Sequence, residues 1–146
     1  MKPPNSTASA YPIALAAKHL NACGAGPECS VTLAGRAGLS AQLWLCRHAY
    51  QSVNHLAGDA GAGERAQVVL LTDMIEPEDV AQAVRRARRH LAADGWLVTW
   101  SRDPKTADDP IHAVLEAEGF TLRRCVHRDG GELHLAKLAE PARIAA

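Results

Sequence analysis

The stretch AQVVLLTD, residues 66–73, is the most apolar run in the chain, and it indicates the fold class. Its apolar residues are continuous from Val68 to Leu71 and do not alternate with polar ones. A run of this kind is typical of a strand buried on both faces, which occurs in parallel sheets covered by helices on either side. The stretch therefore predicts a central strand of an α/β sandwich.

A helix is predicted directly after this strand, over residues 77–93. Acidic residues and a proline at 76–79 suit a helix start. Apolar side chains then recur in steps of three or four, at Val80, Val84, Ala87 and Leu91. The intervening arginines at 85, 86, 88 and 89 fall on the outer face, where a solvated surface explains them better than a nucleic-acid site.

Helices and strands alternate over the rest of the chain. Before the central strand we expect a helix at 11–23, a strand at 30–34, a helix at 39–50 and a strand at 51–56. After it we expect a strand at 96–100, a polar loop at 101–109, a helix at 110–118 and a closing hairpin of strands 121–127 and 132–138. This order predicts a three-layer, Rossmann-like α/β sandwich whose mostly parallel sheet ends in an antiparallel hairpin.

The length of 146 residues is that of one domain. Residues 1–10 are rich in Pro, Ser and Asn and are expected to form a flexible arm, followed by a single domain at 11–140 and a tail at 141–146. The chain has 16 basic and 16 acidic residues. This balance makes nucleic acid an unexpected partner and leaves a small-molecule ligand or another protein.

The first thirty residues hold only a short apolar patch, interrupted by Lys18 and His19. That patch is too short for a membrane span or a signal peptide. The four cysteines are too scattered for the disulfide frame of a small secreted protein. We therefore expect a cytoplasmic protein without a membrane segment.

Two positions are candidates for ligand binding. Gly35, Arg36 and Gly38 lie between a predicted strand and helix, where they could cradle a phosphate or a cofactor, or simply form a tight turn. Asp73 lies at the carboxyl end of the central strand, where parallel sheets present their ligand crevice. It could alternatively cap the next helix or face solvent.

The spacing of histidines and cysteines predicts no metal site. The chain has no His-x-x-x-His and no Cys-x-x-Cys pair. His127 and His134 could face each other across the hairpin, which cross-strand packing explains equally well. Cys46 and Cys125 lie within a predicted helix and strand, and we expect both thiols to be buried and inert.

Three motifs follow one another between residues 66 and 138. A buried strand ends in an acid (VVLLTD, 68–73), a helix runs into LAADG and a strand beginning WLV (91–98), and LEAEGF (115–120) precedes the hairpin. In this order, the chain resembles the C-terminal half of the class I S-adenosylmethionine-dependent methyltransferases. The resemblance implies a Rossmann-like fold and S-adenosylmethionine as the cofactor.

The resemblance also implies roles for particular residues. Gly35, Arg36 and Gly38 correspond to the family's glycine loop, Asn54 stands near the position that binds the ribose, and Asp73 closes the cofactor crevice. Methyl transfer would be an in-line displacement at the sulfonium methyl group, driven mainly by positioning of the acceptor. Asp73 or His55 would be the catalytic base.

The chain departs from the family pattern at three places. The acid that usually precedes the glycine loop is absent, and Thr32 or Leu33 stands in its place. Asn54 and His55 replace the carboxylate expected at the end of the second strand. Nine residues, 57–65, stand where the family has a helix, a strand and a second helix, including the loop that commonly reads adenine. The alternative prediction is therefore a catalytically inactive Rossmann-like protein that acts as an interaction or oligomerisation module. A homodimer would cover the sheet edge that this deletion leaves.

Overall fold

The computed structural model describes residues 11–35, 38–56, 65–102, 110–128 and 130–139. The predicted arm at 1–10 and the tail at 141–146 lie outside the described residues, as does Arg36 of the predicted glycine loop.

In the part of the chain that the structure describes, a six-stranded sheet forms the middle layer, with strand order β2-β1-β3-β4-β6-β5. Four neighbouring strands are parallel, and β6 runs antiparallel to both β4 and β5. The predicted α/β fold with a terminal antiparallel hairpin is confirmed. The strands are β1 (Val31–Ala34), β2 (Val53–Leu56), β3 (Ala66–Ile75), β4 (Leu91–Arg102), β5 (Phe120–Arg128) and β6 (Gly131–Leu138).

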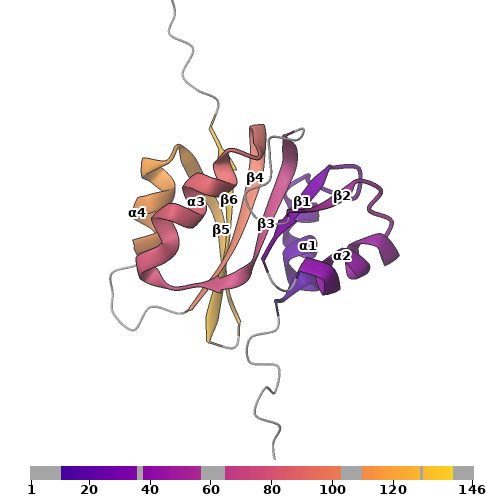
Figure 1. Ribbon diagram of the computed structural model, residues 1–146, viewed down its shortest axis with the longest axis horizontal. Helices are drawn as coiled ribbons and strands as arrows, with labels where there is room; N and C mark the ends of the chain where they lie inside the picture. Colours follow the sequence, from indigo (N-terminus) through magenta and orange to yellow (C-terminus); the bar gives the residue numbers. More distant parts are fainter. Residues whose placement is uncertain (1–10, 36–37, 57–64, 103–109, 129, 140–146) are drawn as a thin grey trace, which may run out of the picture.

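Helices cover both faces of this sheet (Figure 1). One face packs against α1 (Ile13–Ala22) and α2 (Gly38–Arg47). The other face packs against α3 (Val80–Arg88), which follows a 3₁₀ turn at Pro77–Asp79, and α4 (Pro110–Ala117). Among the described residues, no helix has the length and apolar character needed to cross a membrane.

The central strand β3 contributes to both hydrophobic cores. Val68 and Leu70 pack under α1 and α2, whereas Val69 and Leu71 pack under α3. The exposed fractions of Val68, Val69 and Leu70 are each 1% or less. Burying an aliphatic side chain of this size stabilises a fold by about 1.5–3 kcal/mol. The continuous apolar run thus reflects burial on two faces, as the sequence predicts.

The predicted helix over 77–93 is too long at its C-terminal end. The helix ends at Arg88, and Leu91 already belongs to β4, opposite Ala66 of β3. Leu91 is fully buried. Because a buried leucine satisfies the helical stripe and the strand equally well, its apolar character did not distinguish between the two. Asp94, which the sequence placed just after the helix, lies within β4 and has a φ of +61°.

The predicted burial of two thiols is wrong. Both Cys46 and Cys125 are exposed. On α2 the buried positions are Ala41 and Leu45, which place Cys46 on the outer side of the helix. On β5 an irregularity in the pairing with β6, between Leu122 and Arg124, changes which side chains face the covered side of the sheet.

An interaction between α1 and β5 predicts a pH dependence of stability. Arg124 Nη1 lies 2.9 Å from His19 Nδ1, so the neutral ring accepts a hydrogen bond from the guanidinium. Desolvation, followed by the charges of Arg124 and Lys18, lowers the pKa of His19 below its ordinary value of 6.5. The stabilising contribution is therefore present above pH 6.5 and is lost as the pH falls through the lowered folded-state pKa.

We expect the His19→Gln variant to lose less stability than the unmodified chain when the pH is lowered from 7.5 to 5. Urea denaturation at several pH values measures this difference. An identical pH dependence for the two proteins would contradict the assignment.

Candidate functional site

The sheet reverses its strand order next to β1. The chain leaves β1 toward β2 on one side and then crosses to β3 on the other side, so β1 and β3 are parallel neighbours with connections in opposite directions. In open α/β sheets, ligands bind at the carboxyl ends of two strands related in this way. Gly35 directly follows β1, and Asp73 lies near the carboxyl end of β3.

Gly35 is in close contact with β3. Its φ is +124°, and a Cβ atom at this position would lie 2.5 Å from Thr72 Oγ1 and 2.9 Å from the backbone nitrogen of Asp73. The Thr72 hydroxyl also donates a hydrogen bond to the Ala34 carbonyl oxygen, over 3.0 Å. Both the backbone conformation and the space require glycine. The turn after β1 therefore passes directly beside Asp73.

His55 approaches the same turn from β2. Its Nε2 lies 3.2 Å from the Gly35 carbonyl oxygen. Since a carbonyl oxygen only accepts, Nε2 carries the proton in this contact, and a neutral ring then has its lone pair on Nδ1. Asn54 is paired with Thr32 of β1 and lies on the opposite face of β2 from His55, because side chains alternate along a strand.

The structure thus brings together three of the predicted site residues, Gly35, His55 and Asp73. Gly38 is the first residue of α2, and Asn54 stands on the edge strand of the described sheet. The site residues are contributed by the ends of three adjacent strands and the helix start that follows the first of them.

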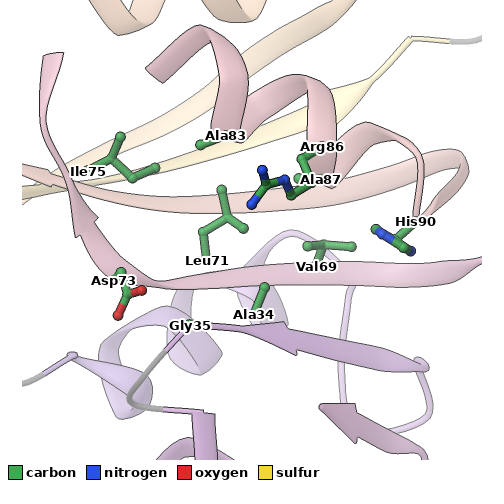
Figure 2. A pocket seen from close by; sticks show the side chains of 10 residues that line it. All are labelled: Ala34, Gly35, Val69, Leu71, Asp73, Ile75, Ala83, Arg86, Ala87 and His90. Carbon is green, nitrogen blue, oxygen red and sulfur yellow. The ribbon is translucent and has the colours of Figure 1, made fainter. Parts of the chain in front are cut away.

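A cavity of about 270 Å³ extends from this turn along β3 and under α3 (Figure 2). Asp73 and Gly35 lie at one end, whereas His90 lies at the other and Arg86 reaches over the apolar middle. Cavities for small molecules usually measure about 300–1,000 Å³, so this one fits part of a ligand, of the size of a nucleoside base. Its lining residues are Ala34, Gly35, Val69, Leu71, Asp73, Ile75, Ala83, Arg86, Ala87 and His90.

The α3 wall of this cavity was not predicted from the sequence. Arg86 was expected on a solvated face, and its side chain is indeed exposed, but it also borders the cavity. The signal that was available is the alanine pair at 83 and 87, one turn apart. Small side chains at these positions leave space between the helix and the strand beneath it.

The close packing of Gly35 predicts a large effect of a small substitution. We expect Gly35→Ala to lower the free energy of unfolding by at least about 2 kcal/mol, from backbone strain and contact with Thr72. Gly24→Ala is the matched control, since Gly24 has a φ of +90° and no atom within 4 Å of an added Cβ. Its cost is strain alone, about 1 kcal/mol. Equal losses in urea denaturation would refute the tight contact.

Similar folds occur among solved methyltransferase structures. The 1,6-didemethyltoxoflavin-N1-methyltransferase of Burkholderia thailandensis, with bound 1,6-didemethyltoxoflavin and S-adenosylhomocysteine, has a TM-score of 0.67 at 14% identity, over 88% of this chain and 78% of that one. Magnesium protoporphyrin IX methyltransferase of Synechocystis PCC 6803, with bound S-adenosylhomocysteine, has a TM-score of 0.65 at 13% identity, over 87% and 82% of the two chains.

An amino pentose methyltransferase from Micromonospora echinaspora, with bound S-adenosylmethionine, has a TM-score of 0.58 at 14% identity, over 87% of this chain and 90% of that one. No protein-family model matches the sequence, and no curated protein matches it. At these identities the similarity concerns the fold. The chain has the Rossmann-like fold of the class I S-adenosylmethionine-dependent methyltransferases.

Proposed function

We propose that the protein binds S-adenosylmethionine, or a closely related nucleoside, at the carboxyl ends of β1 and β3. The observation that carries this proposal is the contact of Gly35 with Thr72 and Asp73 at the point where the strand order reverses. The Gly35 backbone lies there beside Asp73, at the position where α/β sheets bind nucleotides. Structural neighbours that hold S-adenosylmethionine or S-adenosylhomocysteine support this choice of ligand.

Each proposed contact uses a different chemical property. Gly35 and Gly38 let the backbone approach the methionine part of the ligand closely, because glycine adds no side chain. Arg36, which lies outside the described residues, is the proposed source of positive charge. The exposed Asp73 carboxylate accepts hydrogen bonds from hydroxyl or ammonium groups, and Asn54 offers an amide to a ribose hydroxyl.

The apolar cavity under α3 accommodates the base of the nucleoside. Val69 and Leu71 form its floor, and Ala83 and Ala87 leave room above them. The nine residues at 57–65 replace the family's helix–strand–helix unit, which includes the loop that commonly reads adenine, so the cavity beside β3 supplies the apolar contact instead. Its volume of about 270 Å³ suits a base, with the remainder of the ligand lying over the strand ends.

With an acceptor present, the proposed reaction is methyl transfer to a small molecule. The acceptor nucleophile forms a bond to the methyl carbon, the carbon–sulfur bond breaks with its electron pair on sulfur, and the acceptor proton passes to a base. Asp73 and His55 are the proposed bases. The Nε2 contact with Gly35 holds the His55 ring in the tautomer whose basic atom is Nδ1.

Calorimetric titration with S-adenosylmethionine and S-adenosylhomocysteine tests the binding step. We expect Asp73→Asn to weaken binding at least about tenfold, since a hydrogen bond to a charged group contributes about 1.5–3 kcal/mol. Asp79→Asn is the matched control, because Asp79 is also exposed but lies in the turn before α3 and outside the cavity. If millimolar ligand produced no heat of binding and no thermal shift, the proposal would be ruled out.

A specific surface favours the second candidate function, an oligomerisation module. Leu39 and Leu43 lie one turn apart on α2 and are 66% and 52% exposed. Helix α2 packs beside β2, which is an edge of the described sheet and has four residues. An apolar helix surface next to an open strand edge suits contact with a second copy of the chain.

Sedimentation velocity at increasing concentration tests this candidate. We expect a dimer that Leu39→Glu and Leu43→Glu convert to a monomer, because each change places a charge in an apolar contact. Gln82→Glu, an exposed change on α3, should leave the dimer intact. A protein that sediments as a monomer at high concentration would contradict the dimer without affecting ligand binding.

A further inference from the structure

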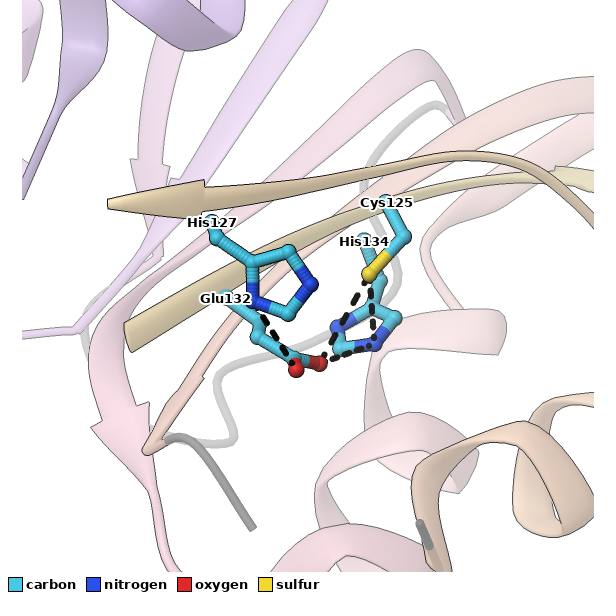
Figure 3. A network of polar contacts seen from close by, with 4 residues as sticks. All are labelled: Cys125, His127, Glu132 and His134. Carbon is cyan, nitrogen blue, oxygen red and sulfur yellow. Dashed lines mark hydrogen bonds and ion pairs between the residues drawn. The ribbon is translucent and has the colours of Figure 1, made fainter. Parts of the chain in front are cut away.

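Four side chains able to bind metal face one another on the terminal hairpin (Figure 3). Cys125 and His127 are two residues apart on β5, and Glu132 and His134 are two residues apart on β6. The strand register pairs Cys125 with His134 and His127 with Glu132. Directly paired residues share one face of a sheet, as do residues two apart on a strand, so the four side chains form a compact square.

Three atoms of this square meet at one point. His134 Nε2 lies 3.0 Å from Glu132 Oε2, and Cys125 Sγ lies 3.6 Å from each of them. Ligand atoms bound to a tetrahedral zinc ion at about 2.0–2.3 Å lie about 3.3–3.6 Å from one another. The sulfur, the nitrogen and the oxygen are therefore already spaced nearly as three ligands of one ion.

Two more histidines border this point. The ligand atoms of His112, from α4, and of Cys125 and His134 all lie within 4.8 Å of one another, so a modest movement of the His112 side chain would bring it into a tetrahedral set. The His112 ring stands edge-on to that of His134, with 5.6 Å between the ring centres. His127 Nδ1 lies 3.3 Å from Glu132 Oε1, the other oxygen of the carboxylate.

The two β6 side chains of the cluster are buried, whereas those from β5 and α4 are exposed. The exposed fraction is 0% for the His134 side chain and 6% for the Glu132 side chain. Cys125, His127 and His112 are exposed. The buried Glu132 carboxylate contacts both His134 and His127, and an ion can reach these ligand atoms from the exposed thiol side.

The same residue types could suggest a nucleophile, a base and an orienting acid. In such a triad the histidine uses one ring nitrogen for the nucleophile and the other for the acid. Here Sγ and Oε2 both contact Nε2 of His134, so the two groups compete for one atom. Convergence on a single point is the geometry of ligands around an ion.

We propose that Cys125, Glu132 and His134 bind a zinc ion, with His112 as the fourth ligand and His127 holding the second oxygen of Glu132. Thiolate, imidazole and carboxylate together suit zinc better than calcium or magnesium, which take oxygen ligands. On binding, the thiol releases its proton to solvent and coordinates as thiolate. The ion ties α4 to the hairpin β5–β6, on a part of the sheet separate from the proposed ligand crevice.

This proposal differs from the expectation of no metal site, which rested on spacings found in helices and loops. On paired strands the corresponding signals are Cys-x-His at 125–127 and Glu-x-His at 132–134. They become a site only through the register that places Cys125 opposite His134.

Zinc titration of the tag-free, chelator-treated chain tests the site. We expect one equivalent to bind and, at a free zinc concentration about 100-fold above the dissociation constant, to raise the melting temperature by at least about 5 °C. Cys125→Ser should weaken zinc binding at least about 100-fold, beyond the about 10- to 100-fold effect of losing a partner that only orients a ligand. Cys46→Ser is the matched control, as an exposed thiol on α2.

Two further measurements report directly on the cysteine ligand, and the second uses only the unmodified chain, so that it does not depend on the folding of a variant. Cobalt(II) should give a thiolate charge-transfer band and the strong visible bands of a tetrahedral ion, both absent in Cys125→Ser. Zinc should slow alkylation of Cys125 and leave that of Cys46 unchanged. Zinc affinity equal in the unmodified chain and Cys125→Ser, or equal protection of both thiols, would overturn the proposal.

Discussion

Burial of β3 on both faces is the constraint on which the rest of the structure depends. Val68 and Leu70 require cover from α1 and α2, and Val69 and Leu71 require cover from α3. A strand with two apolar faces is stable only between two helical layers, and parallel neighbours supply those helices through their crossover connections. The packing of β3 between β1 and β4 then determines where the strand order reverses, and so where Gly35 and Asp73 meet.

The cavity under α3 follows from the same arrangement. The chain passes from β2 to β3 through few residues, so the sheet surface beside α3 is covered by α3 and its alanines at 83 and 87. The result is an apolar groove that continues into the turn at Gly35. An abbreviated fold thus keeps a concave surface at the strand ends, with small side chains providing the space.

The polar cluster of the hairpin lies on the same face of the sheet as α3 and α4, but at β5 and β6. Glu132 and His134 are buried there, and the Glu132 carboxylate contacts both His134 and His127. Buried ionisable groups cost free energy unless they are paired, and the contacts within this cluster provide that pairing. The two candidate sites use separate strand pairs and are independent in their contacts.

The sequence by itself determined the fold class, the order of the elements and the position of Asp73 at a strand end, because burial on two faces, turn residues and helical spacing are local properties. It placed the end of α3 five residues too late, because the buried Leu91 fits a helix and a strand alike. Only the tertiary structure decided that His55 contacts Gly35, that Arg86 borders a cavity and that Cys125 faces His134. Those relations depend on strand register and helix packing between segments distant in the chain, and no local pattern encodes them.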